Sequence, residues 1–323
     1  MTLDEIRRKW VILLTIGMVV VLILTIVTPS NISNLSSYPK PTKDYAEAAQ
    51  RIERLRAQLP KAMNPICQTQ FWSHDKKVGR VIVLIHGYTN CPEQFHELGK
   101  RFYSLGYNVL IAPLPHHGLA DRMTKSHGLL KAEEMTAYAD NVVDIAQGLG
   151  EEVIMMGFSA GGTITAWAAQ NRSDIDLAVM ISPVFGFQKI PTPLTATVMN
   201  IVSFLPDSFE WWNPKQQDHL PPTYTYPRYS LHALAQILRL GFATQAAVNR
   251  IGPRMQLVLN ANDNAVNNAL TRDITKNWQS QKANLTTYEF EAKLKLGHDM
   301  IDPNQPDAEV EIVYPRLIDM VNH

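Results

Sequence analysis

A serine at the centre of a short glycine-containing turn is the residue whose setting most clearly predicts chemistry. Ser159 lies in Gly-Phe-Ser-Ala-Gly, between an apolar run that starts at Val153 and a helix-like segment at 164–170. In a strand, turn and helix setting, a G-x-S-x-G sequence forms a sharp turn that lifts the serine hydroxyl clear of the sheet. Gly157 and Gly161 suit such a turn because side chains there would collide with neighbouring backbone. We therefore predict that Ser159 is a nucleophile.

This nucleophile requires a base to remove its proton and a carboxylate to hold that base in the right tautomer. His298 follows the last predicted strand, in Leu-Gly-His-Asp-Met, and Asp263 follows the strand before it. We therefore predict that His298 takes the proton of Ser159 and that Asp263 orients His298. Other acids nearby in the sequence are alternatives to Asp263: Asp273, Asp299 and Asp302. Asp299 is interpreted as a surface or capping residue, because side chains of adjacent residues seldom meet.

Ser159, Asp263 and His298 can lie close together only if the strands that they follow end side by side in one sheet. Apolar runs predict strands at 81–85, 107–112, 177–182, 256–260 and 286–290, in addition to the run that leads into Ser159. Helical patterns separate them at 92–105, 132–149, 164–170, 269–279 and 310–321, where Pro315 starts or kinks the last helix. Apolar strands that alternate with helices predict an α/β fold, with a mostly parallel sheet and helices on both faces.

Residues 184–251 interrupt this alternation. They contain several proline clusters and helical patches at 195–205 and 229–240. A segment this long is not an ordinary connection, so it predicts a cap inserted over one end of the sheet. Its aromatic residues either line an acyl pocket or form a small core of the cap, and both interpretations stay open for Phe204, Phe209, Trp211 and Trp212.

An uncharged apolar run at 10–28 sets the N-terminus apart. At about 1.5 Å per residue it reaches the ~30 Å of a bilayer core, which predicts a transmembrane helix. The basic residues at 7–9 predict a cytoplasmic N-terminus and a catalytic domain on the outer face. The alternative is a cleaved signal peptide and a secreted protein. The predicted divisions are a cytoplasmic end at 1–9, the anchor at 10–28, a linker with an amphipathic helix at 29–60, and a catalytic domain at 61–323.

The composition argues against several classes of function. Thirty basic and thirty acidic residues give a formal net charge of zero, so no nucleic-acid partner is expected. The sequence has no cluster of metal-ligating residues and no glycine-rich loop that opens a nucleotide-binding helix, so neither a metal nor a cofactor is expected. Cys67 and Cys91 either form a disulfide or are two unrelated thiols. Nothing in the sequence indicates an oligomeric state.

Four motifs resemble the α/β-hydrolase superfamily, in particular its capped esterase and monoacylglycerol-lipase-like branch. They are His-Gly-Tyr-Thr at 86–89, Gly-Phe-Ser-Ala-Gly at 157–161, Asn-Asp-Asn-Ala-Val at 262–266 and Gly-His-Asp at 297–299. The resemblance covers roughly 81–321. One departure lies in the loop Pro-Leu-Pro-His-His-Gly, where His116 stands at a position at which such esterases commonly have glycine.

The resemblance implies a serine hydrolase that cleaves carboxylic esters through an acyl-enzyme. The backbone amides of Ala160 and Tyr88 would form the oxyanion hole, with Thr89 as the alternative to Tyr88. His86 would hold its loop rather than move protons. Three alternatives use the same fold: cleavage of amides or peptides, acyl transfer to an acceptor other than water, and a catalytically silent membrane-bound binding protein.

Overall fold

A seven-stranded sheet, in the order β1-β3-β2-β4-β5-β8-β9, organises the protein. The computed structural model describes residues 3–30, 32–219, 221–246, 252–306 and 308–323, without the side chains of 3–6, 8–9, 19–24, 218 and 246. The strands are β1 Gln70–Trp72, β2 Val78–Ile85, β3 Asn108–Ile111, β4 Gly150–Phe158, β5 Leu177–Ile181, β8 Arg254–Asn260 and β9 Leu285–Phe290. All neighbouring strands pair in parallel except β1, which is antiparallel to β3. The predicted mostly parallel sheet is confirmed.

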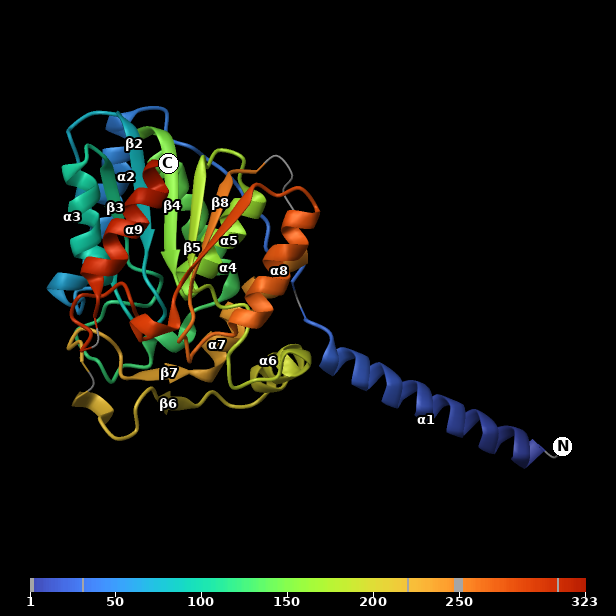
Figure 1. The fold of residues 1–323 in the computed structure, drawn as a ribbon. Coiled ribbons are helices and arrows are strands. Elements are labelled where there is room, and N and C mark those ends of the chain that lie inside the picture. The colour runs from blue at the N-terminus through green and yellow to red at the C-terminus, as the bar shows by residue number, and fades with distance from the viewer. Residues whose placement is uncertain (1–2, 31, 220, 247–251, 307) are drawn as a thin grey trace.

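Helices cover both faces of this sheet (Figure 1). The helices are α2 Tyr45–Ala57, α3 His96–Ser104, α4 Ala132–Ala146, α5 Ala160–Asn171, α8 Asn268–Ser280 and α9 Val310–Asn322. Helices α3 and α9 pack on one face, and α2, α4, α5 and α8 pack on the other. Pro315 lies inside α9, which begins five residues before it.

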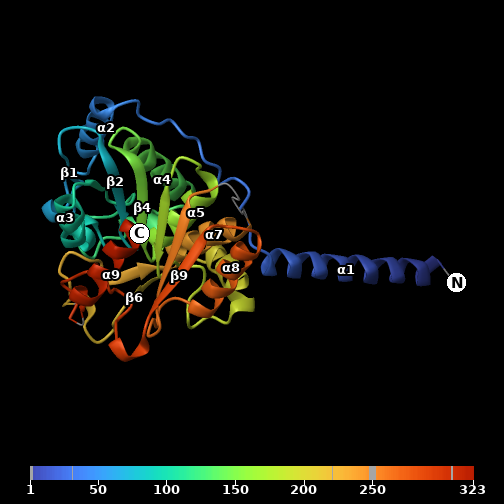
Figure 2. The ribbon, with the colours of Figure 1, turned by 45° about the horizontal axis from the view of Figure 1, so that its top comes forward.

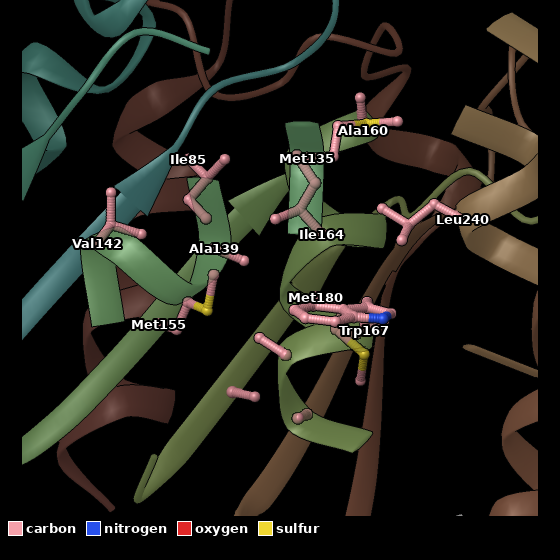
Figure 3. Packing of buried hydrophobic residues seen from close by; sticks show 14 of the residues in the cluster. Ile85, Met135, Ala139, Val142, Met155, Ala160, Ile164, Trp167, Met180 and Leu240 are labelled. Atoms are coloured by element: carbon pink, nitrogen blue, oxygen red, sulfur yellow. The ribbon is translucent and has the colours of Figure 1, made fainter. Parts of the chain in front are cut away.

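Alternate residues of each central strand enter opposite cores, and this explains why the strands are apolar throughout. In β2, Val83 and Ile85 join the core under α4 and α5, whereas Leu84 joins the core under α3 and α9. Figure 3 shows the first core, to which Trp167 of α5 and Met180 of β5 both contribute. Both cores hold the sheet rigidly, so the residues at its strand ends have fixed positions.

The segment predicted as a cap lies beyond the ends of β4, β5 and β8 (Figure 1). Its elements are α6 Thr195–Phe204, the short strands β6 Phe209–Trp211 and β7 Arg228–Ser230, and α7 Leu231–Ala246. The strands β6 and β7 form an antiparallel pair of their own. Residues 247–251, the end of the predicted cap, lie outside the described residues.

The N-terminal helix α1, Leu3–Val27, leads away from the rest of the molecule (Figure 1 and Figure 2). Within the described part of the chain, no helix is both long and apolar enough to cross a membrane. The prediction of a transmembrane anchor at 10–28 is therefore not supported. Part of that range, the side chains of 19–24, lies outside the described residues.

The predicted linker after this helix is bound along α4. The amide of Tyr38 donates to Asp140 Oδ2 (2.6 Å), and the amide of Lys40 donates to Asp144 Oδ2 (2.8 Å). The segment at 32–42 has the irregular backbone expected from its composition. Its peptide groups nevertheless bind side chains of α4, so we call this segment, 32–42, the strap.

Candidate active site

The chain turns sharply from β4 into α5 at Ser159. The serine has φ 55° and ψ −114°, in a region where residues with side chains are strained. A Cβ atom on Gly157 would lie 2.1 Å from the carbonyl oxygen of Gly161, and one on Gly161 would lie 2.1 Å from the carbonyl oxygen of Ile85. The amide of Ser159 donates to the carbonyl of Ile181 (2.8 Å). The turn therefore requires both glycines and is tied to the neighbouring strand.

The structure brings the three residues of the predicted triad into one hydrogen-bonded chain. His298 Nε2 lies 3.1 Å from Ser159 Oγ, and His298 Nδ1 lies 2.8 Å from Asp263 Oδ2. An ionised carboxylate only accepts hydrogen bonds, so Nδ1 carries the proton and Nε2 presents a lone pair to the serine hydroxyl. This arrangement is the one that general-base activation of a serine requires.

Backbone groups hold both partners of the serine in place. Asp263 Oδ1 accepts from the amides of Ala265 (2.9 Å) and Val266 (3.1 Å), which leaves Oδ2 for the histidine. The side-chain amide of Asn260, at the end of β8, donates to the carbonyls of Leu296 (3.0 Å) and Gly297 (2.7 Å). Asn260 thus fixes the loop that carries the histidine, a contribution that the sequence analysis missed because nothing in its spacing marks it.

The electrostatic setting favours an ion pair between the acid and the base. Burial raises the pKa of Asp263, but the charge and hydrogen bond of His298 and two backbone amides outweigh it and lower that pKa overall. Burial lowers the pKa of His298, but Asp263 outweighs burial and raises it above its ordinary value. An imidazolium formed by proton transfer to His298 would therefore be stabilised.

Backbone amides near the serine are left without an acceptor among the described residues. In the described residues, neither the amide of Tyr88 nor that of Ala160 donates a hydrogen bond. A Cβ atom on Gly87 would lie 3.5 Å from Ser159 Cβ, so the loop after β2 reaches the candidate nucleophile. The amide of Thr89 is also without an acceptor among the described residues. The loop can therefore supply the second donor of an oxyanion hole beside Ala160.

His86 is buried and fastens two loops together. Its Nε2 lies 2.9 Å from the amide of Leu114 and accepts from it, so its Nδ1 carries the proton and donates to the carbonyl of Gly87 (2.9 Å). Burial lowers the pKa of His86 to about 4, so the ring is neutral near pH 7. These contacts agree with the loop-holding role that the resemblance implied.

His116 and His117, the competitors considered for the role of base, lie in the loop after β3. His116 contacts Glu134 through Nε2 (2.9 Å), and His117 is buried against the ring of Tyr88. His116 has φ 66°, a backbone conformation that glycine adopts most easily. The glycine that the resemblance implies at this position would adopt the conformation without strain.

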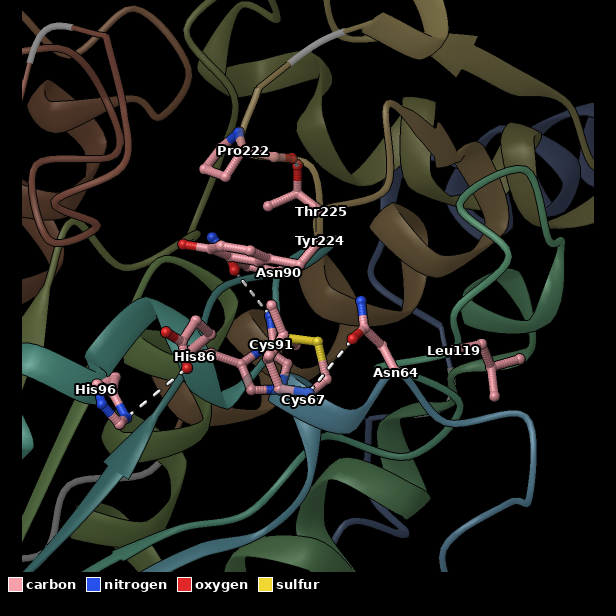
Figure 4. The surroundings of a disulfide bond; sticks show 12 residues. Asn64, Cys67, His86, Asn90, Cys91, His96, Leu119, Pro222, Tyr224 and Thr225 are labelled. Atoms are coloured by element: carbon pink, nitrogen blue, oxygen red, sulfur yellow. Dashed lines mark hydrogen bonds and ion pairs between the residues drawn. A yellow bond between two sulfur atoms is a disulfide. The ribbon is translucent and has the colours of Figure 1, made fainter.

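The two cysteines form a disulfide beside the loop of the free amides. Cys67 and Cys91 are bonded, and both are completely buried. Figure 4 shows Tyr224, from the cap segment, and Asn90 next to this disulfide. The bond ties the segment before β1 to the start of the helical region after β2. Of the two interpretations left open by the sequence, the structure selects the pair.

The aromatic residues of the cap have different surroundings. Trp212 Nε1 donates to Thr89 Oγ1 (2.9 Å), so this side chain ties the cap to the loop after β2. The ring of Phe209 packs edge-on against His127, with centroids 5.4 Å apart. Phe204 is 86% exposed at the end of α6. These residues do not form a single apolar cluster.

Comparisons with known proteins agree with this architecture. Residues 76–292 match the family Hydrolase_4, described as serine aminopeptidase, S33. A thermostable monoacylglycerol lipase of Bacillus sp. (strain H-257) is 25% identical over 187 residues, which cover 56% of this chain and 68% of that protein. The phospholipase YtpA of Bacillus subtilis (strain 168) is 30% identical over 120 residues, 36% of this chain and 45% of that protein.

Solved structures show the same fold at lower identity. The monoacylglycerol lipase of Paleococcus ferrophilus superimposes with a TM-score of 0.60 at 16% identity, covering 78% of this chain and 97% of that one. A soluble variant of the monoglyceride lipase of Saccharomyces cerevisiae gives 0.60 at 14% identity, with 79% and 90% covered. The predicted resemblance is confirmed: the chain belongs to the serine aminopeptidase S33 family of hydrolases and has the α/β-hydrolase fold of the monoacylglycerol-lipase-like branch.

Proposed function

We propose that this protein is a serine hydrolase that cleaves carboxylic esters, of the carboxylesterase or monoacylglycerol-lipase-like kind. The hydrogen-bonded chain from Ser159 through His298 to Asp263, at the ends of parallel strands, carries this proposal. The names of two relatives, a monoacylglycerol lipase and a phospholipase, support an ester of a lipid as the substrate class.

In the proposed reaction, Ser159 Oγ attacks the ester carbonyl carbon while His298 Nε2 takes the hydroxyl proton. The amides of Ala160 and Tyr88 stabilise the oxyanion of the tetrahedral intermediate. The carbon–oxygen bond to the alcohol then breaks, and His298 returns the proton to the leaving alkoxide. Water attacks the acyl-enzyme by the same route, which releases the carboxylic acid and restores the serine.

The proposed mechanism predicts that activity depends on pH, because His298 must be neutral to accept a proton. The pKa of His298 lies above its ordinary value, with burial opposing and Asp263 favouring the shift. Activity should therefore be low below that pKa and rise as the pH increases through it. Asp263→Asn removes the ionised partner and should lower kcat by roughly 10³ to 10⁴-fold.

The experiment is covalent labelling by a fluorophosphonate probe, followed by a substrate comparison. We expect the wild type to be labelled and Ser159→Ala to be unlabelled, with both proteins folded by circular dichroism. A folded wild type that resists the probe and hydrolyses no ester would contradict the enzyme and favour a binding protein.

Ester and amide substrates of matched structure separate the remaining alternatives. We expect kcat/KM for an ester series of increasing acyl length to exceed that for the matched amide. The family description, serine aminopeptidase, favours the amide as the second candidate. Faster cleavage of the amide, or acyl transfer to an added alcohol in place of hydrolysis, would replace the first proposal.

Attachment to a membrane through the N-terminal helix is a separate proposal, supported by the uncharged run at 10–28 and the basic residues before it. We expect the full chain to sediment with membranes and to resist a carbonate wash, whereas a chain that begins after residue 28 should not. Recovery of both proteins in the supernatant would reject the attachment.

A further inference from the structure

A buried side chain joins the two loops that carry the proposed base and one oxyanion amide. Gln94, which is 1% exposed, accepts from the amide of Gly87 through Oε1 (2.8 Å) and donates from Nε2 to Asp299 Oδ2 (2.9 Å). Gly87 directly precedes Tyr88, and Asp299 directly follows His298. One glutamine therefore spans the distance between the loop after β2 and the loop after β9.

The carboxylate of Asp299 is the point where the contacts converge. Its Oδ2 accepts from three side-chain amides, those of Gln94 (2.9 Å), Gln305 (3.0 Å) and Asn90 (3.2 Å). Its Oδ1 faces the backbone amides of Ile301 (3.4 Å) and Asp302 (3.3 Å). A carboxylate with this many donors has one orientation, and the peptide unit next to it is restrained as well. The sequence predicted a surface or capping residue. Asp299 is half-buried and faces the amides of Ile301 and Asp302 as a capping residue does, and its contacts with three side-chain amides were not predicted.

A second contact reinforces the bridge from the side of the disulfide. Asn90 Oδ1 accepts from the amide of Cys91 (2.8 Å), which directs Asn90 Nδ2 toward Asp299 (3.2 Å) and Asp302 (3.5 Å). Cys91 is held by its disulfide to Cys67. The loop after β2 is thus anchored covalently at the residue next to Asn90 (Figure 4).

On the basis of the hydrolase function proposed above, we propose that Gln94 and Asp299 are positioning residues that set the distance between His298 and the Tyr88 amide. The two groups act on one tetrahedral intermediate from different loops. A shift of about 1 Å between such groups costs roughly 100-fold in rate. The bridge acts on kcat more than on KM, because it restrains the groups that act on the reacting atoms.

Asp299 also acts on the base through its charge. Burial lowers the pKa of His298, Asp263 raises it, and the charge of Asp299 raises it further. Asp299→Asn removes that charge and keeps an oxygen that can accept from Gln94. The acid limb of the kcat/KM profile should therefore move to lower pH, a shift that a purely structural residue would not produce.

Gln94→Leu tests the bridge, and Gln305→Leu is its matched control. Both glutamines donate to the same oxygen of Asp299, but Gln305 bonds within its own loop and is not assigned a positioning role. We expect Gln94→Leu to lower kcat by roughly 10 to 100-fold with KM within about twofold, and Gln305→Leu to change kcat by less than about threefold. Equal kcat values for both variants and the wild type would overturn the proposal.

If Gln94→Leu does not fold, Gln94→Glu tests the proposed bridge instead. A carboxylate at this position still accepts from Gly87 but cannot donate to Asp299 until it is protonated. The ratio of wild-type to Gln94→Glu kcat should therefore fall as the pH is lowered from 8 to 6, and a constant ratio would reject the bridge. Failure of the underlying hydrolase proposal appears separately, as a wild type that the fluorophosphonate probe does not label.

Discussion

Two buried groups of acids in this protein are neutralised in different ways. Arg172, whose side chain is completely buried, contacts Asp140 (3.1 Å), Asp144 (2.8 Å) and Asp174 (2.7 Å) under the strap. Near the candidate active site, Asp299 and Asp302 accept hydrogen bonds from side-chain amides and from the hydroxyl of Tyr224. Within the described residues, neither acid forms an ion pair with a cation. The first group has a central cation, and the second has only neutral donors.

This difference separates a structural cluster from one that responds to pH. Burial lowers the pKa of Arg172, but its bonds to Asp174 and Asp144 outweigh burial, so the guanidinium stays charged. Burial raises the pKa of Asp302 to about 7, and the nearby charge of Asp299 adds to the shift. Arg172 therefore keeps its charge at neutral pH, whereas Asp302 changes its protonation there.

The largest expected effect is on stability at the arginine cluster. Arg172→Met should lower the free energy of unfolding by roughly 3 to 5 kcal/mol, because three acids lose their shared cation while two of them remain buried. Urea unfolding at pH 7 measures the loss. Arg316→Met is the control, since Arg316 and Asp319 form an exposed pair whose removal should cost less than about 1 kcal/mol. Equal losses would mean that Arg172 is not the centre of a stabilising cluster.

The second prediction concerns the disulfide between Cys67 and Cys91, which lies beside the group of Asp299 and Asp302 and not beside the cluster of Arg172. Replacing both Cys67 and Cys91 by alanine opens a loop of sequence separation 24. The free energy of unfolding should fall by about 3 kcal/mol, because the unfolded chain gains freedom. Urea unfolding of the double variant, with the reduced wild type for comparison, gives the value. An unchanged midpoint would show that the bond contributes little.

The last prediction is a change in the slope of stability against pH. The pKa of Asp302 is about 7 in the folded chain and near 3.9 in an unfolded one. Between these values the folded state binds more protons, so the free energy of unfolding should fall as the pH rises from about 4 to 7. Asp302→Asn should remove this part of the slope. Urea unfolding at several pH values tests it, and a variant that keeps the wild-type slope would contradict the assignment.

Much of the candidate site was predictable because each of its main residues follows the end of a parallel strand. Ser159, Asp263 and His298 each follow a predicted strand, and the ends of parallel strands meet at one edge of a sheet. The contact of Asp299 with Gln94 was not predicted, because the two residues lie 205 positions apart in the sequence. The strands β1, β6 and β7 were not predicted, since three residues are too few for a periodic pattern, and the helix predicted from residue 229 begins only at Leu231, after β7.

The sequence by itself determined the α/β class, the sheet strands that carry the site and the candidates for nucleophile, base and acid. These follow from hydrophobic periodicity and from motifs whose backbone requirements are local. Only the tertiary structure decided the pairing of Cys67 with Cys91, the binding of the strap to α4 and the bridge through Gln94. Contacts of this kind depend on where side chains distant in sequence meet after packing, and no local spacing encodes that meeting.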